Sequence, residues 1–406
     1  MKNKGNRLMA LEGLRGLAAI SVVVFHFLVL FYPALYYGTG FLQHSKIEDN
    51  LHGTPFNAFI SGTFAVSVFF VLSGFVLTVG FFQTKKNTII EKLAIKRYFR
   101  LMLPALASVI LAWLYITFGL SHNIQAYVFT QSPSMNLLWE TNTNFFHALY
   151  EGTIAIFTQG PIYNFNSVLW TMKYEFIGSF IIFIVALVFG RSKLRLFVYI
   201  ALIIALYNTW FLGFIFGMLL ADIYVNRPKI LPNKKLLLYP LAIISVVLGG
   251  FPTGSITGTA YSFIALPWIR PDQNQSLYTS LGAFLLIICI LNIPLLKKFM
   301  SSKPLVKIGS YTYSMYLVHQ PIIYTLGTGM FTLFIQHFGY NKSVAMSILV
   351  TVPIVAIATI YFYKYVEVSS LQFAAYFEKI YTGKKDISFN VHLKRYINKV
   401  KIAMGR

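Results

Sequence analysis

The sequence predicts an all-α membrane protein, a polytopic bundle of about ten or eleven transmembrane helices with both termini in the cytoplasm. Of its 406 residues, 57% are hydrophobic and only 11% are charged, whereas a soluble domain has about 25% charged residues. Apolar runs of about twenty residues, the length that a helix needs to cross a bilayer, recur along the chain. These runs do not alternate apolar and polar residues as the strands of a membrane barrel do.

Ten apolar windows give the expected spans: residues 9–31, 58–82, 98–118, 170–190, 194–208, 210–225, 236–251, 277–296, 312–333 and 343–363. The fifth and sixth windows are short and nearly continuous, so we expect a tight hairpin that tilts or does not fully cross. The long outer segment 119–169 contains a moderately apolar stretch at 147–157. We expect this stretch to form a short interfacial or re-entrant helix.

Basic residues set the orientation of the spans. The formal net charge is +22, which in a soluble protein would suggest a nucleic-acid partner. Here the lysines and arginines gather in alternate short loops, whereas the opposite loops hold only Lys46, Arg270 and Lys342. Because basic loops stay in the cytoplasm, this asymmetry places both termini there and makes nucleic acid an unexpected partner.

The two ends of the chain are expected to differ. The N-terminus resembles a signal peptide only superficially, because Arg15 interrupts the apolar run and no small-residue cleavage site follows. We expect one membrane domain over residues 1–366 and a basic cytoplasmic tail over residues 367–406, which either lies on anionic inner-leaflet lipids or is disordered. The single cysteine, Cys289, allows neither a disulfide within the chain nor a Cys-based metal site, and no metal is expected.

Two polar residues of the first span are the strongest candidates for a functional site. Arg15 and His26 are eleven residues apart, which places them on one helix face, about 16 Å apart along the axis. A charge inside the bilayer costs about 2.5–3.5 kcal/mol on insertion scales, so it usually faces the bundle interior and has a function. Alternatively, Arg15 snorkels to the inner surface with Glu12 as its i, i+3 partner, and His26 is a satisfied core histidine.

An acidic residue begins the fourth span. Glu175 lies about one turn past the entry point, so its depth could match that of His26. A histidine beside a carboxylate can act as a general base whose tautomer the carboxylate fixes. The alternative is a structural ion pair between Glu175 and Lys173 or a base of the outer loops.

Two arginines flank the third span at its cytoplasmic edge. Arg97 and Arg100 are three residues apart, so they lie on one helix face and could clamp a phosphate or a carboxylate. The alternative is an ordinary basic flank of a membrane helix.

The ninth span opens with hydroxyl-bearing residues, among them Ser314, and places His319 about 10 Å into the membrane. The alternative is an aromatic interface belt followed by a helix-bonded histidine. In the second span, Ser73 and Gly74 form a small step that is expected to allow close helix packing.

Together these motifs resemble those of the acyltransferase-3 family of integral membrane acyltransferases. The resemblance covers about residues 8–365 and rests on five motifs in order: LEGLRGLAA with Arg15 and His26 in Arg-x10-His spacing, FFVLSGF, RYFRLMLP, LWTMKYE and YSMYLVH. It implies a transfer of an acyl group, most often acetyl from acetyl-CoA, to a hydroxyl of a cell-surface or periplasmic polysaccharide or glycolipid. It also implies a multi-pass protein of the bacterial inner membrane.

The resemblance divides the candidate residues into two groups. The expected catalytic residues are His26, as the base, and Glu175, with His26 acting alone or together with Glu175. The residues expected to bind the acyl-CoA donor are Arg15, Arg97, Arg100, Ser314 and His319. The outer loops at 32–57 and 119–169 are expected to choose the carbohydrate acceptor, although they hold no motif that identifies it.

Two other function classes explain the same polar residues differently. A secondary transporter of an envelope sugar or small molecule could use buried arginine, histidine and glutamate as a proton or substrate pathway. Against it, the chain has no paired repeats and few spans broken by glycine or proline in matching halves. A non-catalytic scaffold for envelope assembly would show no chemical phenotype when His26 is replaced.

Overall fold

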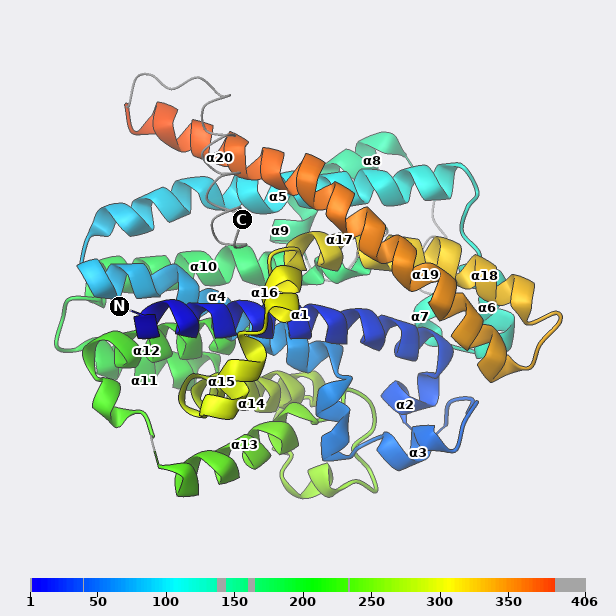
Figure 1. The fold of residues 1–406 in the computed structure, drawn as a ribbon, viewed down its shortest axis with the longest axis horizontal. Helices are drawn as coiled ribbons and strands as arrows, with labels where there is room; N and C mark the ends of the chain where they lie inside the picture. The colour runs from blue at the N-terminus through cyan, green and yellow to red at the C-terminus, as the bar shows by residue number, and fades with distance from the viewer. Residues whose placement is uncertain (1, 39, 137–143, 160–164, 233, 384–406) are drawn as a thin grey trace.

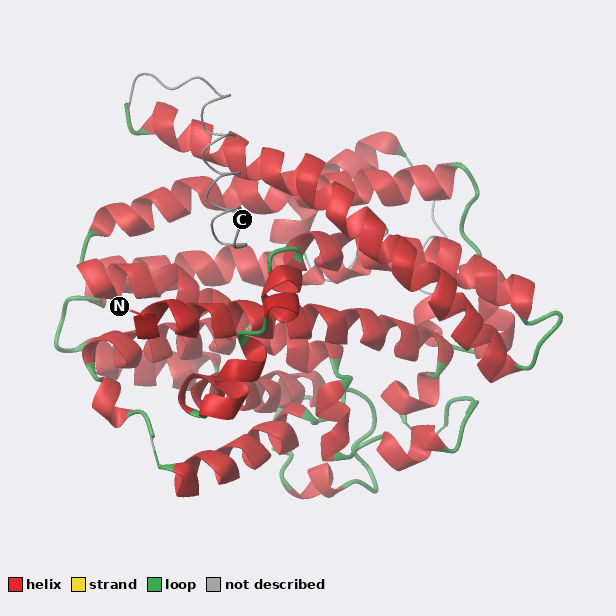
Figure 2. Cartoon of the chain, viewed as in Figure 1, coloured by secondary structure: helices red, strands yellow, loops and turns green. Residues whose placement is uncertain are grey.

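The computed structural model describes residues 2–38, 40–136, 144–159, 165–232 and 234–383. Within these ranges every regular element is a helix and no strand occurs (Figure 2). Six helical stretches of the described residues are long and apolar enough to cross a membrane. The predicted all-α membrane bundle is therefore confirmed.

A helix lies over each of the predicted spans. The long helices are α1 (Lys2–Phe31), α4 (Gly62–Thr84), α5 (Asn87–Thr117), α10 (Trp170–Phe189), α14 (Pro271–Asn292) and α19 (Tyr340–Phe362). The shorter ones are α11 (Arg195–Leu206), α12 (Leu212–Asn226), α13 (Lys235–Gly249), α17 (Thr312–Ile322), η6 (Ile323–Gly327) and α18 (Thr328–Phe334). Helices α11 and α12 have 12 and 15 residues, too short to cross a core of about 30 Å, as the predicted hairpin requires.

Short helices connect and extend these elements. Those in the first half are α2 (Pro33–Tyr37), α3 (Ile47–Leu51), η1 (Pro55–Phe59), α6 (Asn123–Thr130), α7 (Pro133–Asn136), α8 (Phe145–Tyr150), η2 (Glu151–Ala155), α9 (Ile156–Thr158) and η3 (Ser167–Leu169). Those in the second half are η4 (Pro228–Ile230), η5 (Ala260–Phe263), α15 (Pro294–Met300), α16 (Lys303–Gly309), η7 (Tyr363–Glu367) and α20 (Val368–Tyr381).

Helix α1 runs through the middle of the bundle, and the short helix α16 crosses over it (Figure 1). Glycines make this crossing close. A Cβ atom on Gly13 would overlap the carbonyl oxygen of Met300, and one on Gly309 would overlap that of Glu12. The glycines of the first motif therefore bring α15 and α16 close to the middle of α1, where Arg15 lies.

Helices α4 and α12 also meet backbone to backbone. A Cβ atom on Gly74 would overlap the carbonyl oxygen of Phe214, and one on Gly217 would overlap that of Val71. Small residues allow membrane helices to approach in this way. The close helix packing predicted at Ser73 and Gly74 is therefore confirmed at Gly74.

The stretch predicted to be an interfacial or re-entrant helix is helical and consists of α8, η2 and α9. It runs beside α5, with the ring of Phe145 5.0 Å from that of Trp113 and the carbonyl of Thr153 accepting a 3.0 Å hydrogen bond from the Tyr98 hydroxyl. Trp113 and Tyr98 are about 22 Å apart along α5. The stretch thus follows α5 far into the bundle, which favours the re-entrant form.

Helical structure continues past residue 366, where the membrane domain was expected to end. Helices α19, η7 and α20 form one continuous stretch, and α20 lies along α5 (Figure 1). The ring of Phe377 packs 4.6 Å from that of Phe99, and Glu378 forms an ion pair of 3.3 Å with Lys96. Residues 384–406 of the predicted basic tail lie outside the described residues.

Candidate active site

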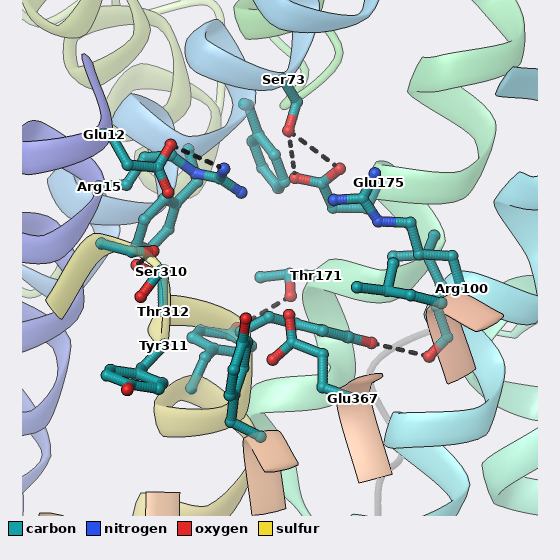
Figure 3. A pocket seen from close by; sticks show the side chains of 18 of the residues that line it. Glu12, Arg15, Ser73, Arg100, Thr171, Glu175, Ser310, Tyr311, Thr312 and Glu367 are labelled. Carbon is teal, nitrogen blue, oxygen red and sulfur yellow. Dashed lines mark hydrogen bonds and ion pairs between the residues drawn. The ribbon is translucent and has the colours of Figure 1, made fainter. Parts of the chain in front are cut away.

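A cavity of about 1210 Å³ lies among α1, α4, α5, α10, α16, α17 and the junction of η7 with α20 (Figure 3). Its cationic lining residues are Arg15, Arg97, Arg100, Lys303 and Lys307. Its carboxylates are Glu12, Glu175 and Glu367. Its hydroxyl groups belong to Ser73, Thr171, Ser310, Tyr311, Thr312, Tyr313, Tyr316 and Tyr363. The excess of cations over carboxylates suits an anionic ligand, and the volume suits a large one.

The lining of the cavity approaches two histidines and includes neither of them. Lys303 and Lys307 belong to α16, which lies within a predicted cytoplasmic loop. Tyr316 also lines the cavity, and its ring lies 6.1 Å from that of His319, which contacts His26. Tyr316 and His319 therefore lie between the cavity and the histidine of the first span.

Glu175 is bound by two neighbours that both line the cavity. The guanidinium of Arg97 forms an ion pair with its carboxylate and a 3.0 Å hydrogen bond with its backbone carbonyl. The Ser73 hydroxyl donates to the carboxylate oxygens at 2.9 and 3.2 Å. The structure therefore brings Glu175 to Arg97 and does not bring it to His26. Ser73, expected to be structural, here binds a carboxylate of the cavity.

The two arginines of the predicted clamp have different environments. Arg97 is only 6% exposed, and the carboxylate of Glu175 neutralises its charge. Arg100 is exposed to the cavity, and no ion pair joins it to another described residue. Of the two, Arg100 has the free guanidinium that a phosphate or carboxylate would need.

Arg15 faces the cavity together with its predicted i, i+3 partner. Its Nη1 lies 3.5 Å from Oε2 of Glu12, and the two side chains are 32% and 36% exposed. Figure 3 shows this pair on the side of the cavity opposite Arg100. The predicted pairing with Glu12 is thus confirmed, and both groups border the cavity.

Ser314 reaches the cavity through a carboxylate that the sequence reasoning missed. It is fully buried, and its backbone N–H and hydroxyl donate to Oε2 of Glu367 at 3.2 and 2.5 Å. Glu367 lines the cavity (Figure 3). The sequence offered one signal for Glu367: it is a single carboxylate just after the last apolar span. The expected basic tail began at this position.

His26 and His319 contact each other. Nε2 of His319 lies 3.1 Å from Nδ1 of His26, and the ring centroids are 4.7 Å apart. Nδ1 of His26 also lies 2.8 Å from the carbonyl oxygen of Val22. Because a carbonyl oxygen only accepts hydrogen bonds, Nδ1 of His26 carries the hydrogen and its Nε2 holds the lone pair of a base.

The described residues contain no group of three or more histidine, cysteine, aspartate or glutamate side chains that could hold a metal ion. Cys289 is buried against the backbone carbonyl of Leu238 and does not line the cavity.

Comparisons with known proteins agree with these features. A family model described as an acyltransferase domain matches residues 9–363. The chain is 22% identical to the O-acetyltransferase PaAT-1 of Phomopsis amygdali over 423 aligned positions, which cover 89% of this chain and 82% of that protein. No solved structure matches significantly.

Proposed function

Because this chain belongs to the acyltransferase-3 family, we propose that it transfers an acetyl group from acetyl-CoA to a hydroxyl of a cell-surface or periplasmic polysaccharide or glycolipid. The observation that carries the proposal is a cationic cavity whose lining residue Tyr316 adjoins His319, the neighbour of His26. The printed name of the relative, an O-acetyltransferase, supports acetyl as the transferred group. In this proposal the membrane is a bacterial inner membrane, with the cavity on its cytoplasmic side.

The donor occupies the cavity in an extended form. Its phosphate groups lie near Arg100, Lys303 and Lys307, which line the cavity and form no ion pairs within the described chain. Ammonium and guanidinium groups without a carboxylate partner bind phosphate best, because no existing bond must break first. The thioester then lies beyond Tyr316, near the histidines.

The reaction needs one base. Nε2 of His26 takes the proton of the acceptor hydroxyl, and the acceptor oxygen attacks the carbonyl carbon of the thioester. As the new C–O bond forms, the C–S bond breaks, and the CoA thiolate leaves and receives the proton from His26. A direct transfer of this kind requires no covalent acyl-enzyme.

The acceptor approaches His26 from the side opposite the donor. The ring of His26 packs 5.1 Å from that of Phe25, and Phe25 packs 5.0 Å from Tyr36. Tyr36 belongs to α2, which follows the first span on its predicted outer side. In this proposal the loops at 32–57 and 119–169 select the carbohydrate.

The experiment uses membranes from cells that express the protein and acetyl-CoA labelled in its acetyl group. The expected result is release of free CoA together with labelled acetyl in the carbohydrate fraction, both absent from control membranes. Proton-driven uptake of a sugar without acetyl transfer would instead support a transporter and would overturn the proposal.

A further inference from the structure

We propose that His319 is a positioning residue for His26, accepting the Nδ1–H of His26 at its own Nε2 and stabilising the positive charge that His26 gains during transfer. This inference rests on the proposed function, because it assigns a role within that reaction. It assigns His319, which was expected to bind the acyl-CoA donor, to the support of the proposed base instead.

Two backbone carbonyls fix the hydrogens of both rings. Nδ1 of His319 lies 2.9 Å from the carbonyl oxygen of Met315, so this nitrogen carries a hydrogen and its Nε2 holds a lone pair. Nδ1 of His26 carries a hydrogen because it contacts the carbonyl oxygen of Val22 at 2.8 Å. In the 3.1 Å contact between the rings, Nε2 of His319 therefore accepts from Nδ1–H of His26, which shares its single hydrogen between His319 and the Val22 carbonyl.

This direction leaves Nε2 of His26 as the basic atom. When that nitrogen takes a proton, the ring becomes an imidazolium and its Nδ1–H becomes a stronger donor. A hydrogen bond from a charged donor is about twice as strong as a neutral one. The lone pair of His319 therefore binds more strongly in the transition state than in the ground state, which is the condition for faster catalysis.

A carboxylate usually has this role beside a catalytic histidine. Here the carboxylate expected to do so, Glu175, is bound by Arg97 and Ser73. The described hydrogen bonds of His26 and His319 join them to each other and to backbone carbonyls, with no carboxylate among these partners. The neutral imidazole of His319 takes the place of the carboxylate.

The position of His319 agrees with this role better than with donor binding. Its side chain is 0% exposed, and it does not line the cavity, whereas Tyr316, one turn earlier on α17, does. Neither histidine lines the cavity, but the side chain of His26 is partly exposed whereas that of His319 is not. His319 is therefore placed to hold the ring of His26 rather than to contact a ligand itself.

Two polar substitutions of His319 distinguish a positioning role for this residue from a packing role. The amide of His319→Gln extends to the position of Nε2, so its oxygen can still accept from His26. The shorter His319→Asn keeps an N–H for the Met315 carbonyl but leaves the Val22 carbonyl as the one remaining described acceptor of Nδ1–H of His26. Loss of such an orienting partner lowers activity by about 10–100-fold.

The measurement is the rate of CoA release at varied acetyl-CoA in membranes that contain equal amounts of each variant. We expect kcat to fall by about 10–100-fold in His319→Asn and by less than about threefold in His319→Gln, with the KM for acetyl-CoA unchanged in both. His337→Ala, which removes an exposed histidine outside the site, is the matched control and should equal the wild type.

Nitrogen NMR of the ¹⁵N-histidine-labelled protein in lipid bilayers gives a second readout. The wild type and His319→Gln should show His26 as the Nδ1–H tautomer in a hydrogen bond, whose signal moves in His319→Asn. Equal kcat in the Asn and Gln variants, or a raised KM for acetyl-CoA, would overturn the inference. Failure of the proposed function is distinguishable, because the wild type itself would then release no CoA.

Discussion

Arg97 and Glu175 show how a single pair of residues shapes the cavity. Both side chains are largely buried, with 7% and 14% exposed, and Ser73 binds the same carboxylate. A buried charge without its partner is costly, since removing one member of such a pair costs about 3–5 kcal/mol. The pair therefore holds α5 against α10 and leaves Arg100 as the free guanidinium of its motif.

The losses of thermal stability caused by replacing Arg97 and Glu175 are expected to be coupled rather than additive. Glu175→Met should lower the thermal midpoint in lipid nanodiscs, because Arg97 is then buried and unpaired, at a cost of about 3 kcal/mol. The double variant with Arg97→Met should recover most of the loss. Additive losses in the two single variants and the double variant would show that the pair does not stabilise the fold.

The sequence indicated most residues of this site but only one of their pairs, Arg15 with Glu12. Arg15, Arg97, Arg100 and Glu175 all line the cavity, because a charge in an apolar span has few other places to lie. Which arginine meets which carboxylate depends on the rotation and offset of α5 against α10, and neither follows from spacing within one helix. The contact between His26 and His319, residues on two distant helices, was out of reach for the same reason.

At the scale of elements, α16 forms a wall of the cavity that carries two cations. Gly16 and Gly309 allow it to cross α1 in close contact, and Lys303 and Lys307 lie one turn apart on its cavity side. Since i and i+4 positions are neighbours on a helix, the two ammonium groups can contact one phosphorylated ligand together.

This arrangement predicts a donor-specific defect. Lys303→Ala and Lys307→Ala should each raise the KM for acetyl-CoA about fivefold, corresponding to about 1 kcal/mol for an exposed charge pair. They should leave the KM for acetyl-pantetheine, which lacks the nucleotide, unchanged. Lys298→Ala on neighbouring α15, outside the cavity lining, is the control, and an equal change for both donors would contradict the assignment.

Hydropathy located the helices, yet it misplaced some of their ends. The third span was expected to begin at residue 98, whereas α5 begins at Asn87, because a helix can continue as a polar surface helix before it enters lipid. The glycines of the first motif had no assigned role in the sequence, since the backbone of α16 that they contact lies almost three hundred residues away in the chain. Such contacts follow from topology rather than from local pattern.

At the scale of the whole molecule, the cavity is built from helices that are distant in sequence and come together around α1 (Figure 1). Arg15 borders the cavity, and His26 lies about 16 Å farther along the same helix. In the proposed reaction, one helix therefore connects the cationic donor region with the base.

The most direct test of this claim is the release of CoA and the transfer of labelled acetyl by His26→Ala in membranes with amounts of protein equal to wild type. Loss of a general base typically lowers the rate by about 10²–10⁴-fold. We predict a loss of at least about 100-fold, with the thermal midpoint and the KM for acetyl-CoA near those of the wild type. Wild-type rates of acetyl transfer by His26→Ala would contradict the account.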